Sequence, residues 1–267
     1  MRLADYIIET LAEIGVNQAF LITGRGALFL TDAVAKSKHI EAVCHHNEQA
    51  ASYAAGACAQ LNNKHSLCLV STGCASTNSV TGVLNAYQDG LPVVYLSGQN
   101  ILAETTGYTG LGIRTYGQQE ANIVEIVKPI TKYAVMITRA EDIRYHLEKA
   151  IYLANSGIKG PVWLDVPLDL QSAQINPEEL KKFEAKEPIS KSTKDVDFIK
   201  KSLSSAERPV ILIGSGIRSA GVEKELKTFA ERNEIPVAYT GSSPDIYPLS
   251  NDLSVGSVGS MGSMRSG

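Results

Sequence analysis

The sequence predicts an α/β protein: a parallel sheet with helices on both faces, followed by a linker and an incomplete second α/β domain. Three observations lead to this fold class. Short, almost unbroken apolar runs of strand length recur in the first part of the chain, as is typical of strands buried on both faces of a parallel sheet. Helical apolar patterns alternate with these runs, and glycine-containing turns join several of the pairs. This alternation favours an open sheet with right-handed crossovers.

The elements follow one another along the chain. Leu3, Ile7, Leu11 and Ile14 recur at helical spacing, and Gly15 then ends the first predicted helix. Strands are expected at Gln18 to Thr23, Ile40 to Cys44, Ser66 to Ser71, Pro92 to Ser97, Tyr133 to Ile137 and Val162 to Val166. Helices are expected at Ala27 to Ser37, Glu48 to Leu61, Ser79 to Tyr87 and Ala140 to Ser156.

The composition changes after residue 170. We expect residues 171–195 to form a linker, because Gln174 to Lys194 is rich in Lys, Glu, Pro and Ser and poor in apolar residues. A second α/β unit then begins, with a strand, a helix and a strand at Val210 to Ile213, Val222 to Asn233 and Pro236 to Thr240. The tail from Ser250 to Gly267 shows no helix or strand long enough to close a domain. We therefore expect the second domain to be cut off part-way.

The composition also excludes several classes of function. The chain has 267 residues, of which 44% are hydrophobic, and a formal net charge of -3, which argues against a disordered protein and against a nucleic-acid binder. No apolar stretch approaches the roughly 18 residues of a membrane-spanning helix, and Met1 opens directly onto an amphipathic pattern, so we expect neither a span nor a signal peptide. The four cysteines lack CxxC spacing. We expect reduced, mostly buried thiols in a cytoplasmic protein.

Two glycine-containing turns are candidate ligand-binding loops. The turn Thr23-Gly24-Arg25-Gly26 separates a strand from a helix, where glycine lets the backbone approach a ligand and the helix N-terminus favours an anion. An ordinary strand-to-helix turn explains the same residues, and the Gly-Lys-Ser/Thr of a Walker loop is absent. Gly214-Ser215-Gly216 in the second unit lacks the third glycine of a dinucleotide motif, at Ser219. It is therefore weak support for a nucleotide site.

Two further segments carry polar residues at helix entrances. Asn47 is a good N-cap, and a carboxylate at Glu48 suits the first helical turn, so a purely structural role explains this pair. His45 and His46 are adjacent and no HExxH motif is present, so we expect no metal ligand among them. The segment 71–78 is rich in hydroxyl groups that would line a pocket or cap a helix. It also holds Cys74, either a reactive thiol at a helix entrance or a packed, inert one.

Taken in order, these segments resemble the thiamine-diphosphate-dependent enzymes of the acetolactate synthase and pyruvate decarboxylase group. The resemblance covers almost the whole chain. Its motifs are the Gly24/Gly26 turn, His46 to Ala50, Ser71-Thr72-Gly73 with Thr77-Asn78, Leu91-Pro92, Ser97-Gly98-Gln99, Gln119-Glu120, Lys128 to Lys132 and Gly160 to Pro167. Thr23 to Gly26, Gly117 to Glu120 and Pro161 to Trp163 are most similar to acetolactate-synthase-like proteins of surface-sugar gene clusters.

The resemblance implies roles for individual residues. Residues 1–170 would bind the pyrimidine of thiamine diphosphate. Glu48 matches the family glutamate that hydrogen-bonds the pyrimidine ring nitrogen and passes a proton, and Gln119 matches an active-site glutamine; these are the implied catalytic residues. The implied cofactor-binding residues of this domain are Thr23, Gly24, Arg25, Gly73, Asn78 and Gln119.

The resemblance also bears on the rest of the site. Residues 196–267 would begin the central domain, which binds FAD in acetolactate synthases, and Gly214, Gly216 and Thr240 fall where those contacts begin. The Mg²⁺ that accompanies the cofactor would be held by a Gly-Asp-Gly…Asn motif of a third domain that this sequence does not contain. We therefore expect no metal ligand here and no turnover by this chain alone. Homodimers or homotetramers are implied for the family.

Two departures from the family bear on the reaction. Cys74-Ala75 replaces a usual Pro-Gly, and Gln118 stands where acetolactate synthases typically carry Phe. The implied activity is thiamine-diphosphate-dependent decarboxylation of a 2-keto acid, with pyruvate as the expected substrate, and carboligation to a second carbonyl. Two alternatives stay open: two-carbon transfer from pyruvate to a keto group of a nucleotide-linked sugar, and a non-catalytic protein that binds a partner.

Overall fold

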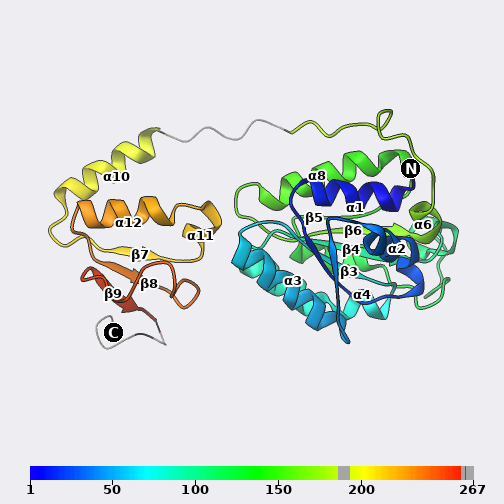
Figure 1. Cartoon of the computed structure of the whole chain (residues 1–267), viewed down its shortest axis with the longest axis horizontal. Coiled ribbons are helices and arrows are strands. Elements are labelled where there is room, and N and C mark those ends of the chain that lie inside the picture. The colour runs from blue at the N-terminus through cyan, green and yellow to red at the C-terminus, as the bar shows by residue number, and fades with distance from the viewer. Residues whose placement is uncertain (186–192, 260–261, 263–267) are drawn as a thin grey trace. The chain divides into compact units, whose positions relative to one another are not determined.

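The computed structural model describes residues 1–185, 193–259 and 262. The chain divides into two compact units, Met1–Ala185 and Lys186–Gly267, and each described part has its own sheet. Figure 1 shows the first unit in blue to green and the second in yellow to red. Each unit is described here by itself.

The first unit is built on a six-stranded sheet in which every pair of neighbouring strands is parallel. Its order is β2-β1-β3-β4-β6-β5. The strands are β1 (Gln18–Leu21), β2 (Glu41–Cys44), β3 (Ser66–Val70), β4 (Val93–Gln99), β5 (Tyr133–Met136) and β6 (Val162–Pro167). The predicted parallel α/β sheet is confirmed.

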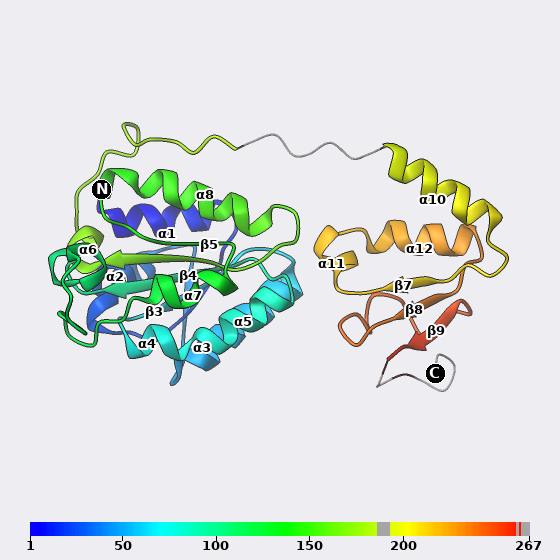
Figure 2. The same cartoon turned by 180° about the vertical axis from the view of Figure 1, so that it is seen from behind.

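Helices cover both faces of this sheet, as Figures 1 and 2 show from opposite sides. One core contains the inward-facing residues of α1 (Leu3–Glu13), α2 (Leu28–Lys36) and α8 (Ile143–Asn155). The other contains those of α3 (Glu48–Asn62), α5 (Val80–Gln88) and α7 (Ile123–Val127). Along β3, Leu67 and Leu69 join the first core while Cys68 and Val70 join the second. This alternation is why the strand is apolar from Leu67 to Val70.

Short elements complete the first unit. They are α4 (Cys74–Asn78), α6 (Thr106–Thr109), α9 (Leu168–Gln171) and the 3-10 turns η1 (Arg25–Ala27), η2 (Leu102–Glu104), η3 (Lys128–Ile130) and η4 (Ala140–Asp142). The sequence did not predict α4, α6, α7 or α9, because a single turn is too short to show helical periodicity.

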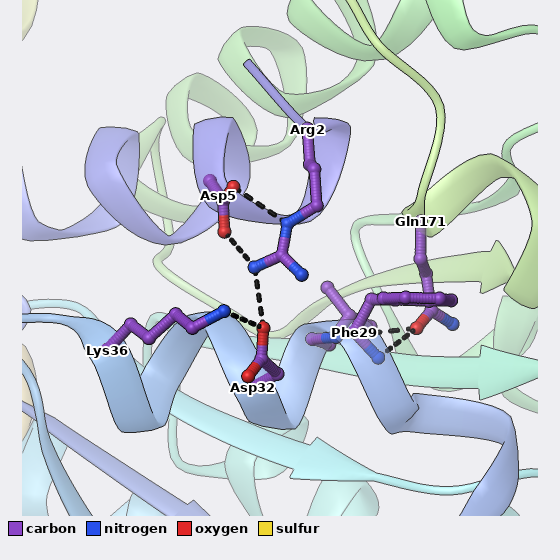
Figure 3. A network of polar contacts seen from close by, with 7 residues as sticks. Arg2, Asp5, Phe29, Asp32, Lys36 and Gln171 are labelled. Atoms are coloured by element: carbon purple, nitrogen blue, oxygen red, sulfur yellow. Dashed lines mark hydrogen bonds and ion pairs between the residues drawn. The ribbon is translucent and has the colours of Figure 1, made fainter.

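The first unit extends beyond residue 170, which corrects the expected linker of 171–195. Gln171 is fully buried. Its Nε2 donates to the carbonyl oxygens of Gly26 and Val166, at 2.6 and 2.8 Å. Its Oε1 accepts from the backbone N–H groups of Phe29 and Leu30, at 3.2 and 3.3 Å, and so caps α2 (Figure 3). The tight packing extends the unit to Ala185.

Replacing Gln171 by Leu is expected to lower the free energy of unfolding by about 3 kcal/mol, because buried backbone groups lose their only capping side chain. Urea unfolding of the chain measures the change. Gln174→Leu is the matched control, since Gln174 is exposed. A loss for Gln171→Leu no larger than that of the control would show that the contacts of Gln171 contribute little.

An ion-pair network ties α1 to α2 at the N-terminus (Figure 3). Arg2 Nη2 lies 2.6 Å from Asp5 Oδ1 and 2.7 Å from Asp32 Oδ2. Lys36 Nζ lies 2.8 Å from the same Asp32 oxygen. The side chains are partly exposed, so the network orients the two helices more than it stabilises the fold.

The second unit has a three-stranded parallel sheet in the order β7-β8-β9. Its elements are α10 (Thr193–Ser205), β7 (Ile211–Ile213), α11 (Gly216–Ala220), α12 (Glu223–Arg232), β8 (Val237–Tyr239) and β9 (Ser254–Ser257). One sequence expectation needs correction, because helix α10 begins inside the expected linker. The tail, which was expected to hold no strand long enough to close a domain, holds the 4-residue strand β9. Residues 186–192, 260–261 and 263–267 of the linker and tail lie outside the described residues.

The cysteines differ from expectation. Cys68 is buried, Cys58 is partly buried, and Cys44 and Cys74 are exposed, so the prediction of mostly buried thiols was wrong. Cys74 is exposed because it begins α4 at the open edge of the sheet rather than packing beneath it. No helix in the described part of the chain is long and apolar enough to span a membrane.

Candidate functional site

The strand order creates a crevice at the carboxyl edge of the first sheet. After β1 the chain crosses to β2 on one side, and after β2 it returns to β3 on the other side of β1. The loops that follow β1 and β3 therefore diverge. Such a switch point is where open α/β sheets bind ligands, and the turn 23–26 and the segment 71–75 occupy it.

A pocket of about 280 Å³ lies at this edge. It is lined by Thr23, Gly24, Arg25, Gly26, Ser71, Thr72, Ala75, Gln99, Asn100, Ile101, Gln118, Gln119 and Leu168. Gln99 is the last residue of β4. The other lining residues follow β1, β3, β4 and β6 or belong to the loop that precedes α7. Four of the residues implied by the family resemblance thus share one pocket: Thr23, Gly24, Arg25 and Gln119.

The backbone of Gly73 is in close contact with the backbone of Gln119. Its φ is +63°, and Gln119 itself has a φ of +54°, an uncommon conformation for a residue with a side chain. A Cβ on Gly73 would overlap the carbonyl group of Gln119. Only glycine therefore allows the two backbones to approach so closely, and this contact sets the position of Gln119 at the pocket.

Glu48 and Asn78 meet at the N-terminus of α3. Asn47 caps the helix by accepting from the backbone N–H groups of Gln49 and Ala50, at 2.9 and 3.2 Å, as its sequence position predicted. Glu48 is then the first helical residue and is half-buried. Asn78, at the end of α4, donates its side-chain amide to Glu48 Oε2 at 2.7 Å. The pair lies outside the lining of the pocket, at the same edge of the sheet.

Arg25 and Gln118 are both in the pocket lining and are in direct contact. Arg25 Nη1 donates to Gln118 Oε1 at 2.8 Å, between exposed side chains. Asn100 Nδ2 donates to the carbonyl oxygen of Gln118 at 3.1 Å, which ties the loop that holds Gln118 and Gln119 to the end of β4. The sequence did not predict that Gln118 contacts Arg25, because the two are 93 residues apart and the loop that holds Gln118 has no periodic pattern.

Two known protein-family models match the chain, one in each unit. Residues 1–126 match the family model described as the N-terminal TPP binding domain of thiamine pyrophosphate enzymes, and residues 196–266 match the model of their central domain. The chain belongs to the thiamine pyrophosphate enzymes. The resemblance seen in the sequence is therefore confirmed. The Glu48–Asn78 pair and all lining residues of the pocket except Leu168 lie within the N-terminal match.

Curated relatives of this chain carry the name acetolactate synthase. The large subunit of Lactococcus lactis is 32% identical over 263 residues, which cover 97% of this chain and 44% of the relative. Isozyme 3 of Escherichia coli is 31% identical over 268 residues (97% and 45%), and the chloroplastic protein of Arabidopsis thaliana is 30% identical over 266 residues (98% and 38%). The chain thus spans less than half the length of these relatives.

A buried carboxyl group that the sequence did not single out lies beneath the pocket. Ser97 and Asp165 pair across β4 and β6, and Asp165 is almost completely buried. It accepts from Ser97 Oγ at 2.6 Å and from Gln99 Nε2 at 3.0 Å. Trp163 Nε1 donates to the same Ser97 oxygen at 2.8 Å. The signal in the sequence was an aspartate inside an apolar strand, where carboxylates are rare unless paired.

The stability of the first unit is expected to depend on the ionisation of Asp165. Burial raises the pKa of Asp165 from 3.8 to about 7, against hydrogen bonds from Ser97 and Gln99 that lower it. The folded state therefore binds the proton more tightly than the unfolded state. The protonated carboxyl of Asp165 contributes fully to stability below about pH 4, and this contribution is lost as the pH rises through about 7. Asp165→Asn should remove this decrease of stability with rising pH.

Thermal unfolding of the wild-type chain and Asp165→Asn, measured across the range from about pH 4 to pH 8, tests this expectation. Asp89→Asn is the control, because Asp89 is exposed. The readout is the change of the unfolding temperature with pH, rather than the unfolding temperature at any one pH. A slope that persists unchanged in Asp165→Asn would assign the pH dependence to another group.

Glu120 organises the loop beside Gln119. Its Oε1 accepts from the backbone N–H and the hydroxyl of Thr106, at 2.5 and 2.7 Å, and its Oε2 accepts from the N–H of Tyr116 at 2.8 Å. Burial acts to raise the pKa of Glu120, but these hydrogen bonds outweigh it and lower the pKa. Glu120 therefore stays an acceptor that closes the loop from residue 106 to residue 116.

The second unit brings together two of the residues expected near a flavin. Gly214 follows β7 and Thr240 follows β8, at the same edge of the parallel pair. A Cβ added at Gly214 would lie 3.5 Å from Thr240 Oγ1. Gly216, in contrast, faces open space at the start of α11. The described residues hold no group of three or more His, Cys, Asp and Glu side chains that could bind a metal.

Proposed function

We propose that this chain supplies the pyrimidine-binding side of a thiamine-diphosphate-dependent enzyme. Its reaction would be decarboxylation of a 2-keto acid, pyruvate, and carboligation of the remaining two-carbon unit to a second carbonyl. The observation that carries the proposal is the Glu48 carboxylate, which begins α3 and is held by Asn78 at the edge of the sheet that also forms the pocket. The acetolactate synthase names of the relatives support the same reaction class.

The residues at this edge fit an aminopyrimidine ring. A half-buried carboxylate is within reach of a ligand, and the hydrogen bond from Asn78 fixes its direction. At Gly24 a Cβ would overlap the side chain of Ser71, so this turn lies closely against the end of β3. Thiamine diphosphate supplies an electron sink for decarboxylation, a chemistry that side chains lack.

The chain's own residues would bind and move a proton. Asn78 occupies Glu48 Oε2, so we expect Oε1 to exchange a proton with the ring nitrogen. Glu48 is the first residue of α3, so the positive end of the helix dipole lies beside its carboxylate. Gln119, held against Gly73, would orient the substrate at the pocket through its side-chain amide.

We also propose a homodimer or homotetramer. Tyr53 of α3 and Leu84 and Tyr87 of α5 are 43%, 40% and 44% exposed, on two helices that pack together beside Glu48. Exposed apolar groups on neighbouring helices are typical of interaction surfaces. A second copy would cover these helices, and Mg²⁺ would be bound, with the diphosphate, by residues outside those described here.

For the second unit we propose that the edge holding Gly214 and Thr240 begins an FAD site, with Gly216 at its open end. The contact between Gly214 and Thr240 supports a close backbone approach to a ligand. Flavin absorption by the purified natural protein tests this, and a colourless protein that takes up no added FAD would contradict it.

The natural protein that carries this chain should consume pyruvate and release carbon dioxide when thiamine diphosphate and Mg²⁺ are added. The assay is run with and without a second carbonyl compound, so that decarboxylation and carboligation are measured separately. Omission of thiamine diphosphate is the control. A natural protein that consumes neither pyruvate nor other 2-keto acids under these conditions would overturn the proposed function.

A further inference from the structure

Arg25 is the only charged residue in the lining of the pocket, which is otherwise made of glycines, apolar side chains, hydroxyls and amides. Its guanidinium is exposed. Other arginines are neutralised: Arg2, Arg139 and Arg144 each pair with a carboxylate at 2.6 to 2.8 Å. No carboxylate pairs with Arg25 within the described part of the chain. The guanidinium of Arg25 therefore puts a positive charge in the pocket, and the lining contains no carboxylate to neutralise it.

Gln118 fixes this guanidinium without neutralising it. Its Oε1 accepts from Arg25 Nη1 at 2.8 Å. A guanidinium has five N–H donors and this bond uses one, so donors remain for a ligand. Because the amide oxygen faces Arg25, the Nε2 group of Gln118 is a further donor beside it. Asn100 anchors the backbone of Gln118 at 3.1 Å, so the pair is held in place before a ligand arrives.

This arrangement suits a group with several negatively charged oxygens. A planar guanidinium with a neighbouring amide can donate to two oxygens of one carboxylate or phosphate, and such charge-assisted bonds are the strong ones. At about 280 Å³ the pocket is of a size for a small molecule or one end of a larger one. Neutral amides of Gln99 and Gln119 at the walls add no repulsion.

We propose that Arg25 and Gln118 form the subsite that recognises the anionic group of a substrate, a carboxylate or a phosphate, at the pocket of the first unit. This subsite rests on the proposed function, because only that reaction makes the bound anion a substrate. It makes Arg25 a specificity-determining residue: a neutral molecule of the same size would gain nothing from its charge.

The test is an NMR titration of the ¹⁵N-labelled chain with pyruvate and, separately, with uridine diphosphate. We expect saturable shifts of the Arg25 Nε–H and Gln118 side-chain signals with at least one of them. Arg25→Met should weaken that binding by about tenfold or more, the usual effect of losing a charge-assisted hydrogen bond. Arg139→Met is the matched control, since Arg139 is an exposed arginine remote from the pocket lining and should bind like wild type.

A second variant keeps the arginine. Gln118→Glu places a carboxylate against the guanidinium, and we expect it to weaken anion binding although Arg25 remains. Binding of pyruvate alone would assign the subsite to a keto-acid carboxylate, and binding of uridine diphosphate alone would assign it to a phosphate of a larger acceptor. The proposal is overturned if neither anion binds saturably, or if Arg25→Met binds as tightly as wild type.

This binding is measured without thiamine diphosphate and without turnover. A natural protein that turns over no 2-keto acid, while the chain shows Arg25-dependent binding, would overturn the proposed function and leave the anion subsite standing. A natural protein with turnover, whose chain shows no Arg25-dependent binding, would overturn the subsite alone.

Discussion

Replacing Glu48 by Gln is expected to reduce 2-keto acid turnover by the natural protein about 10²-fold or more, the range typical for removal of a general acid–base group. The amide of Gln is nearly the same size and can still accept from Asn78, which bonds Glu48 Oε2 at 2.7 Å. It cannot exchange a proton. The loss should therefore appear in turnover, while thermal unfolding of the variant stays close to that of wild type.

Glu41→Gln is the matched control for this experiment, because Glu41 is exposed on the edge strand β2. It should keep normal turnover. The comparison separates a proton-transfer role from a general effect of removing a negative charge. Normal turnover by Glu48→Gln would remove Glu48 from the mechanism, whereas an unfolded variant would assign it a structural role.

Replacing Gly98 by Ala is expected to give the largest loss of stability, about 3 kcal/mol or more, because added volume in a packed interior forces the backbone to shift. Gly98 is buried in β4. A Cβ there would overlap the backbone of Gly26, the last residue of the pocket turn, and of Ala27, which follows it. No flexible side chain can move aside, so the turn that carries Arg25 must move.

Gly56→Ala provides the opposite expectation. Gly56 is inside α3, and its added Cβ would meet only Leu91 Cδ1 at 3.6 Å, an ordinary contact. Alanine is favoured over glycine in helices by up to about 1 kcal/mol, so this variant should be as stable as wild type or more so. Urea unfolding of both variants makes the comparison. Equal stability of the two would show that the approach of β4 to the turn is not tight.

The elements were predictable because their signals are local. The apolar run around Leu67 and Leu69 identified β3, and Asn47 identified the start of α3 within one residue. Glu48 followed directly, since the position after an N-cap is the first helical turn. The motifs in family order pointed to the same domain, which the family matches confirm. Elements of one turn, such as α4, were missed because periodicity needs more residues.

The buried polar contacts were not predictable. Nothing near Gln171 in the sequence shows that it caps α2 across the sheet, so its segment was taken for linker. Asp165 is flanked by apolar residues, and its partner Ser97 comes from a strand far away along the chain. Exposure of Cys74 likewise depends on where α4 lies at the edge of the sheet. Such contacts arise only when distant segments pack.

The sequence by itself determined the α/β class, the helix and strand order, the family and the position of Glu48 at a helix start, because each depends on neighbouring residues or on a linear motif. The tertiary structure alone decided the strand order and therefore the switch point between β1 and β3. Only that order brings Arg25 to Gln118, Gly73 to Gln119 and Asn78 to Glu48. Hydrogen bonding between strands and close packing act through space, and the linear sequence does not record which segments they join.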